Sequence, residues 1–399
     1  MDIESGRTAQ RQRLFTRPFV LLSLAELAYF SATGVAIYTL PVYVTGPVGS
    51  DAAGVGLAFG AFAVVALMLR PLAGRVADVR GRRPIMVAGA LLCAVCLALT
   101  AQAATLGGVV ALRLLLGAAE AAFFVAAVAA LVDLAPQSRM GEALSYNSLG
   151  LYLGLTAGPP LGELLVRTVG FAAAWVGAAV LAAGAAALVL GIGETRPPGP
   201  LGQGARHLIH RASLPVGLAF LASTVAMGGF FAFAALHAAD VRLTTTSLPL
   251  LTYGAVVVVV RIACARVPDR VPPLPLGACA ILTMAVGLTV LALWTSPAGA
   301  VIGAGVMGLG IAFSTPALFA AAFARASADA RGAASGTLSA FLDLGIGGGP
   351  ILLGLVARSS GIPAAFSVAA GVALLGGVRA IVLAVRERQS AAGAAAVAA

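Results

Sequence analysis

The sequence predicts an all-α integral membrane protein with twelve transmembrane helices, forming two pseudo-symmetric six-helix bundles around a central cavity. Of its 399 residues, 60% are hydrophobic and only 10% are charged, whereas a soluble domain carries about 25% charged residues. Apolar runs of about 20 residues, the length that crosses a hydrocarbon layer as a helix, recur along the whole chain. These runs do not alternate polar and apolar residues, as the strands of a membrane β-barrel would.

Twelve apolar runs, separated by glycine, proline or charge, give the predicted helices. A polar interval rich in proline at 194–213 divides them into two sets of six. We therefore expect an N-terminal half at 1–192, a cytoplasmic linker at 193–212 and a C-terminal half at 213–399. The first run is too long for the apolar core of a signal peptide, so we read it as a retained helix. The expected helices are 18–44, 53–73, 84–104, 107–132, 140–165, 169–192, 213–237, 247–266, 273–294, 298–324, 332–357 and 362–385.

The arginines predict the orientation in the membrane. Of the 25 basic residues, 21 lie at the two termini or in every second connection between helices, and the others are Arg113, Arg167, Arg242 and Arg358. Positive residues stay on the cytoplasmic side, so we expect both termini in the cytoplasm and the chain in the plasma membrane. Because the net charge of +10 is spread over alternate connections, it predicts no nucleic-acid-binding face.

An internal repeat relates the two halves. Arg70, Arg75 and Asp78 recur 191 residues later as Arg261, Arg266 and Asp269, and other positions repeat at the same offset. A duplicated six-helix unit predicts a binding site between the halves and transport by alternating access. The other matches are Val76 with Val267, Gly141 with Gly332, Ser148 with Ser339, Gly154 with Gly345 and Gly158-Pro159 with Gly349-Pro350.

The stretch RPLAGRVADVRGRR, residues 70–83, carries a family resemblance. Its pattern Gly74-x-x-x-Asp78-x-x-Gly81-Arg82-Arg83 resembles the helix 2–3 signature of the major facilitator superfamily. The resemblance covers essentially the whole chain, although the second copy has Ala265 and Pro272 in place of the two glycines.

That resemblance implies a gating loop. The aspartate would pair with an arginine and with the start of helix 11 in one conformation only, which would bias a two-state equilibrium. We expect Gly74 to allow close helix approach, Gly81 to permit a tight turn, and the arginines to hold the loop inside. The gating residues are Arg70, Gly74, Asp78, Gly81, Arg82 and Arg83, with a second-half copy at Arg261, Arg266 and Asp269.

Among the ionisable residues inside predicted spans, where charge is costly and usually functional, four stand out. They are Glu26, Arg113, Glu120 and Asp343. Arg113 and Glu120 are two helical turns apart and so share a face, and Arg113-x-x-x-Gly117 resembles the helix 4 motif of proton-coupled members of the superfamily. We expect these four groups to couple transport to protons, with Glu26 as the main carrier.

Glycines recur at every fourth position of predicted helix 5, leaving a groove in which another helix can pack. With Pro159, they resemble the antiporter motif of drug:proton exporters in the superfamily. The match is incomplete, because Ser145 stands where that motif has its first glycine and Glu163 where it has its last. Predicted helix 11 carries a counterpart, and we expect bends at both places. The helix 5 positions are Gly150, Gly154, Gly158, Pro159 and Gly162, and those of helix 11 are Gly345, Gly349 and Pro350.

These patterns favour a monomeric transporter that is not an enzyme and needs neither cofactor nor metal. A phosphate-binding loop is excluded because the chain has no lysine, no His/Asp/Glu cluster with metal spacing lies in the spans, and the four cysteines read as small buried residues.

Few polar groups occur in the spans, so we expect export of a lipophilic, even cationic, small molecule against protons. The alternative is proton-coupled or facilitated uptake of a sugar, organic acid or amino acid. The cavity-lining candidates are Tyr29, Tyr38, Asn147 and Tyr152.

Overall fold

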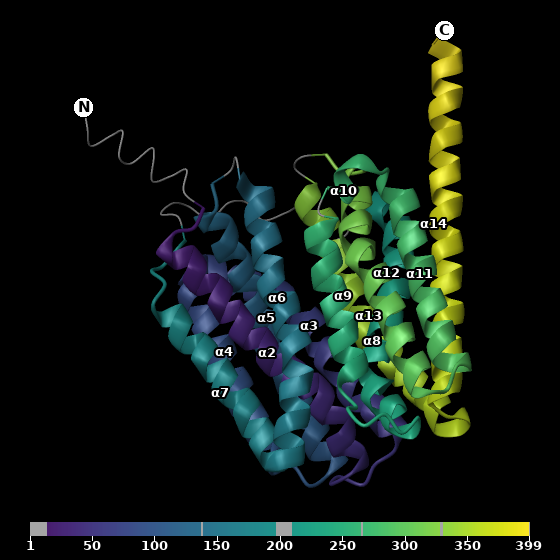
Figure 1. Cartoon of the computed structure of the whole chain (residues 1–399). Helices are drawn as coiled ribbons and strands as arrows, with labels where there is room; N and C mark the ends of the chain where they lie inside the picture. Colours follow the sequence, from purple (N-terminus) through teal and green to yellow (C-terminus); the bar gives the residue numbers. More distant parts are fainter. Residues whose placement is uncertain (1–13, 137–138, 197–209, 265, 328–329, 399) are drawn as a thin grey trace, which may run out of the picture. The chain divides into compact units, whose positions relative to one another are not determined.

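The computed structural model describes residues 14–136, 139–196, 210–264, 266–327 and 330–398, and within these ranges every regular element is a helix (Figure 1). Most of the expected linker, 197–209, lies outside the described residues. The helices before it are α2 (Arg17–Thr45), α3 (Ala52–Arg80), α4 (Arg82–Thr100), α5 (Leu106–Leu134), α6 (Met140–Thr168) and α7 (Phe171–Leu190).

After the linker, the short 3-10 turn η2 (Arg211–Ser213) leads into the second set of helices. Most predicted helices match the observed ones to within a few residues. The observed helices are α8 (Leu214–Asp240), α9 (Leu248–Ala263), α10 (Val267–Arg270), α11 (Pro273–Leu293), α12 (Pro297–Phe323), α13 (Arg331–Ser360) and α14 (Ile362–Ala398).

Three of the helix ends that differ from the prediction have a local explanation in the sequence. Helix α3 continues to Arg80, because its charged end RVADVR contains good helix formers and no breaker before Gly81. Helix α14 continues to Ala398 through an alanine-rich tail, alanine being the strongest helix former. Helix α9 ends early, at Ala263, and the segment that follows contains Pro268, whose ring cannot be accommodated in a helix interior.

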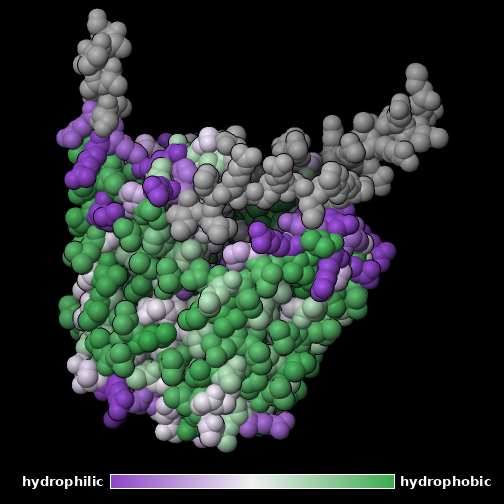
Figure 2. All heavy atoms as spheres, turned by 180° about the vertical axis from the view of Figure 1, so that it is seen from behind, coloured by the Kyte–Doolittle hydropathy of each residue, from purple (hydrophilic) through white to green (hydrophobic). Residues whose placement is uncertain are grey.

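Eleven helices of the described chain are long and apolar enough to cross a membrane, and α9, with 16 residues, is a shorter apolar helix. In Figure 2 hydrophobic side chains cover the middle of the visible surface, and hydrophilic ones gather at its ends. The chain is therefore a multi-pass membrane protein.

The repeat seen in the sequence recurs in the helix boundaries. Helices α4, α5, α6 and α7 begin at residues 82, 106, 140 and 171, and α11, α12, α13 and α14 begin at 273, 297, 331 and 362. Each pair is offset by the same 191 residues. Even the glycines with positive φ before α7 and α14, Gly170 and Gly361, correspond at this offset.

The chain divides into two compact units, one with residues 1–43 and 64–202 and the other with 44–63 and 203–399. The second unit thus contains the start of α3. The reason is close packing of that segment on α13: a Cβ atom at Gly56 would overlap the carbonyl of Pro350, and one at Gly354 would lie 2.7 Å from the carbonyl oxygen of Ala52. The expected halves, 1–192 and 213–399, remain a prediction.

Candidate functional site

A buried carboxylate lies in the first unit between α2 and α6. Glu26 of α2 is 1% exposed and Asn147 of α6 is 8% exposed. The Asn147 Nδ2 donates a hydrogen bond of 2.7 Å to Glu26 Oε2. The other oxygens, Glu26 Oε1 and Asn147 Oδ1, are buried and accept no hydrogen bond from any described residue. A buried polar atom without a hydrogen bond is costly. These two oxygens are therefore suited to accept hydrogen bonds from a bound proton or ligand.

A second polar group lies one turn along α2. Tyr29 stacks on Phe123 of α5 with ring centroids 4.0 Å apart and planes at 6°. Its hydroxyl group lies within hydrogen-bonding reach of the Cys93 thiol of α4 and the Glu120 carboxylate of α5. Arg113 interacts electrostatically with the same three groups. The structure therefore places predicted residues from two separate proposals, proton coupling and cavity lining, in one cluster.

Glu120 also interacts electrostatically with Glu26, which connects the two groups of side chains. We call these six residues the acid cluster. It spans four helices, each of them long and apolar enough to cross a membrane. Its members are Glu26, Tyr29, Cys93, Arg113, Glu120 and Asn147.

Cys93 is the member that sequence reasoning missed. It is 3% exposed, as expected of a small buried residue, but its thiol contacts polar groups instead of only hydrocarbon. Its one signal in the sequence is its place in a predicted span, and that signal is shared with many apolar residues.

Three other predicted residues are not members of the acid cluster. Asp343 belongs to α13 of the second unit and is 4% exposed. Tyr38 is buried where α2 contacts Gly162 of α6, about 18 Å along the helix from Glu26 at 1.5 Å per residue. Tyr152 is half-buried in α6, and its carbonyl oxygen accepts the hydroxyl of Thr156.

The predicted gating loop forms a charged network in the first unit. Arg82, at the first position of α4, forms an ion pair with Asp78 one turn earlier and a second one, of 3.2 Å, from Nε to Asp133 Oδ2 at the end of α5. Arg196 donates to the carbonyl oxygens of Asp78 and Val79 at 3.0 and 2.6 Å. The pairing of Asp78 with an arginine is thus present in this structure.

Gly81 has φ +102°, a conformation that glycine adopts at no steric cost, which confirms the tight turn. The expectation for Gly74 is not supported: a Cβ atom there would meet only Val125 Cγ1, at an ordinary 3.6 Å. Arg70 lies well before the loop, with its guanidinium 5.1 Å from the centre of the Phe124 ring. It therefore contacts an aromatic side chain of α5.

The start of α4 is capped from a distance by Glu194, just after α7. Glu194 Oε1 accepts the backbone N–H of Arg82 at 2.8 Å, and Oε2 accepts that of Arg83 at 3.3 Å. Partial burial raises the pKa of this carboxyl, but backbone N–H bonds from four residues outweigh it and hold the pKa below its ordinary value. A side chain at Gly81 would collide with the Glu194 carboxylate, which gives a second reason for glycine.

In the second half the copied motif has a different local structure. Arg261 lies near the end of α9 and Arg266 precedes α10. Pro272, which corresponds to Gly81 of the first half, precedes α11 with φ −53°. The side chain of Asp269 lies outside the described part of the chain, so its role remains a prediction.

The glycines of α6 form the surface on which α2 packs. Cβ atoms at Gly154 and Gly158 would lie 2.7 and 2.5 Å from backbone atoms of Ser31 and Gly34, and those at Gly150 and Gly162 would lie 3.1 Å from carbonyl oxygens of α2. Helix α6 runs unbroken through Pro159 and Pro160.

The corresponding glycines of α13 form the surface on which α8 packs. Gly345 contacts Thr224, and Gly349 contacts the backbone of Val225. Pro350 lies within the helix, which continues to Ser360. The two units therefore use corresponding glycines to hold corresponding helices. No group of three metal-binding side chains occurs in the described ranges.

A multi-pass helical protein with internal repetition and a buried acid cluster has the architecture of a membrane transporter. The sequence model of the Major Facilitator Superfamily matches residues 22–300 and 216–398. The chain belongs to this superfamily, and it is an MFS transporter.

Relatives match nearly its whole length. An uncharacterised MFS-type transporter of Salmonella typhimurium is 27% identical over 369 residues, covering 89% of this chain and 93% of its own. One from Burkholderia mallei is 30% identical over 371 residues, covering 89% and 90%.

Two solved structures share the fold. The human organic anion transporter MFSD10 (TETRAN) matches with a TM-score of 0.70 at 19% identity. A variant of the nucleoside transporter NupG matches with a TM-score of 0.72 at 15% identity. In both comparisons 91% of this chain and 99% of the other are covered.

Proposed function

We propose that this transporter exports a lipophilic drug or metabolite, cationic compounds included, in exchange for protons. The single observation that carries the proposal is the Glu26 carboxylate, buried within a membrane-crossing helix with only one of its oxygens hydrogen-bonded. An ionisable group at such a place is a functional site by default.

The proton step follows from the geometry of Glu26. When the site opens to one side, the carboxylate binds a proton from water and becomes a neutral carboxylic acid. When it opens to the other side, the O–H bond breaks and the proton returns to water. Asn147 holds one oxygen throughout, and the charges of Glu120 and Arg113 set the electrostatic balance of the cluster.

The rest of the machinery is assigned by position. Asp343 is a second buried acid, in the other unit, and we assign it a supporting role in proton coupling. The network of Asp78, Arg82 and Asp133 is assigned to gating, since an ion pair made in one state alone biases an equilibrium between two. We further propose a monomer in the plasma membrane with both termini in the cytoplasm.

Uptake of a small polar nutrient is the second candidate. The fold is shared with a nucleoside transporter and an organic anion transporter, and Arg113 would suit an anionic group. Export is preferred because most buried side chains of the described spans are apolar, and an apolar site with few polar groups binds lipophilic ligands.

The test uses inside-out membrane vesicles with an acidified lumen and a panel of lipophilic compounds. We expect each transported compound to evoke proton efflux, which Glu26→Gln abolishes because the amide cannot take up a proton. Asn147→Ala should weaken the coupling. Glu142→Gln is the matched control, because Glu142 is an acid of α6 that pairs with Arg139 at the helix start.

Either of two results would contradict antiport. One is compound transport with no proton movement in the wild-type protein. The other is accumulation of sugars, organic acids or amino acids in intact cells with no response to any lipophilic compound, which would replace export with uptake.

A further inference from the structure

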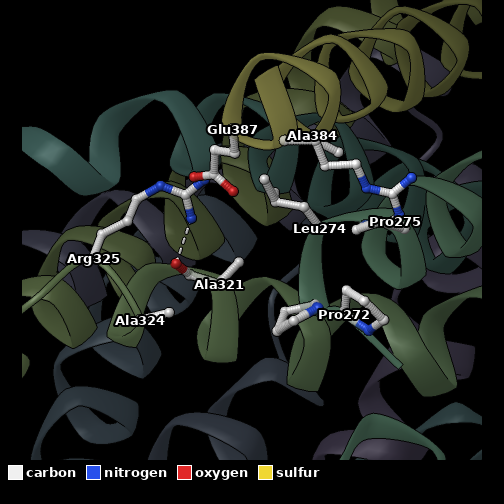
Figure 3. A pocket seen from close by; sticks show the side chains of 10 residues that line it. Pro272, Leu274, Pro275, Ala321, Ala324, Arg325, Ala384 and Glu387 are labelled. Atoms are coloured by element: carbon white, nitrogen blue, oxygen red, sulfur yellow. Dashed lines mark hydrogen bonds and ion pairs between the residues drawn. The ribbon is translucent and has the colours of Figure 1, made fainter. Parts of the chain in front are cut away.

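A cavity of about 340 Å³ lies at one end of the second unit, where α11 begins, α12 ends and α14 passes (Figure 3). The membrane-crossing segments of these helices are Pro273–Leu293, Pro297–Phe323 and Ile362–Gln389. All three begin or end at the cavity, so it lies at the boundary between hydrocarbon and water.

The cavity has an apolar part and a charged part. Leu274, Ala321 and Ala384 supply hydrocarbon, together with the prolines at the start of α11. Arg325 and Glu387 point toward each other and form an ion pair (Figure 3). A lining of this kind matches an amphipathic ligand, with one apolar and one charged end.

The charge that remains available is positive. Arg325 is neutralised by Glu387 and also donates to the carbonyl oxygen of Ala321. Arg388 lines the same cavity, is exposed, and forms no ion pair with any described side chain. The N-terminal end of α11, a helix of 21 residues, adds the positive end of a helix dipole.

From this arrangement we propose that the cavity binds an anionic phospholipid, with the headgroup phosphate on Arg388 and an acyl chain against the apolar wall. Basic pockets between transmembrane helices recognise anionic headgroups in this way. Beside the cavity, α14 exposes Ile381, Val382 and Val385, an apolar surface that an acyl chain can follow. The ammonium of a zwitterionic lipid would gain little here, because Glu387 is already paired.

The experiment measures lipid retention by the purified full-length chain in detergent, using native mass spectrometry with added phosphatidylglycerol. We expect one tightly held lipid per chain. Arg388→Gln should weaken retention about fivefold, the effect of one basic residue near an anionic surface. Glu387→Gln should strengthen it, because the change frees Arg325 for the phosphate.

Arg386→Gln is the matched control, since it removes the same charge two positions away on α14, on a different face of the helix. It should retain lipid like the wild type. Because Arg388 is exposed, its replacement leaves the packing intact, and a thermal unfolding midpoint equal to that of the wild type checks this.

Three results would overturn the proposal. Equal loss in Arg386→Gln and Arg388→Gln would indicate general surface charge. Equal retention of phosphatidylethanolamine would exclude selection for anionic lipid. Displacement of the lipid by millimolar inorganic phosphate would show that the cavity binds a free anion.

Discussion

Gly34 and Gly158 face each other where α2 packs against α6, with no side chain between the two backbones. A Cβ atom at Gly158 would lie 2.5 Å from the Gly34 Cα and 2.6 Å from the Ser31 carbonyl oxygen. Both of these atoms belong to a helix backbone and cannot move aside alone. The separation of α2 and α6, and with it the hydrogen bond between Asn147 and Glu26, depends on these glycines.

We predict that Gly158→Ala destabilises the first unit. The added methyl group must push α2 away, and overpacking of this kind typically costs about 1–3 kcal/mol. The thermal unfolding midpoint of the purified protein should fall, and transport should fall with it. In the matched control, Gly184→Ala in α7, the methyl group enters open space, so the midpoint should stay or rise. Equal effects of the two changes would contradict the role of close packing.

Three consecutive glycines of α13 provide a sharper comparison. A Cβ atom at Gly349 would lie 3.0 Å from the Val225 Cα, whereas one at Gly348 would contact nothing. We predict that Gly349→Ala lowers the unfolding midpoint and that Gly348→Ala does not. Both variants make the same substitution at adjacent positions of one helix. If both lowered the midpoint equally, the cause would be the α13 backbone and not the contact between Gly349 and α8.

The cap that Glu194 forms on α4 predicts a dependence on pH. The pKa of its carboxyl is below the ordinary value of 4.5, so its stabilising effect is complete above that value and disappears as pH falls through the folded pKa. We expect Glu194→Gln to be less stable than the wild type near neutral pH, with the difference vanishing in acid once the Glu194 carboxyl is protonated in the folded protein.

Hydrogen exchange locates this effect. In Glu194→Gln the amides of Arg82 and Arg83 should exchange faster near neutral pH, because they lose a charged acceptor. The start of α11, which Glu194 does not cap, serves as the internal control. Unchanged exchange at both helix starts would mean that the carboxylate does not hold α4.

The sequence predicted the helices, the repeat and five of the six members of the acid cluster, for reasons that are local. Hydrophobic runs mark spans, and a charge inside a span is conspicuous, as with Glu26 and Arg113. By contrast, Asp133 and Glu194, which bind Arg82 and cap α4, are 51 and 112 residues away from it. Nothing in a single sequence indicates such pairings, because they depend on where α5 and α7 end in space.

The same limit explains the assignments of Arg70 and Gly74. Both belong to a sequence pattern whose other members form the charged network. From the pattern alone, we expected Arg70 and Gly74 to act in the same loop. The structure separates them, because α3 runs unbroken for 29 residues. Arg70 therefore lies about three helical turns before the turn at Gly81, beside Phe124 of α5.

A final prediction concerns Asp51, which has two partners in the second unit. Its Oδ1 accepts the backbone N–H of Gly54 at 3.0 Å, which caps α3, and its Oδ2 forms an ion pair of 3.0 Å with Arg358 near the end of α13. Both side chains are substantially exposed, so the ion pair should contribute at most about 1 kcal/mol. The cap should contribute about 1 kcal/mol by itself.

Three variants separate the two contributions. Arg358→Gln and Asp51→Asn both remove the ion pair, but asparagine still caps the helix, so each should lower the unfolding midpoint only slightly. Asp51→Ala removes both interactions and should lower it further, with faster hydrogen exchange at Gly54. If Asp51→Asn were as destabilising as Asp51→Ala, the charge would hold α3 to α13 and the cap would contribute little.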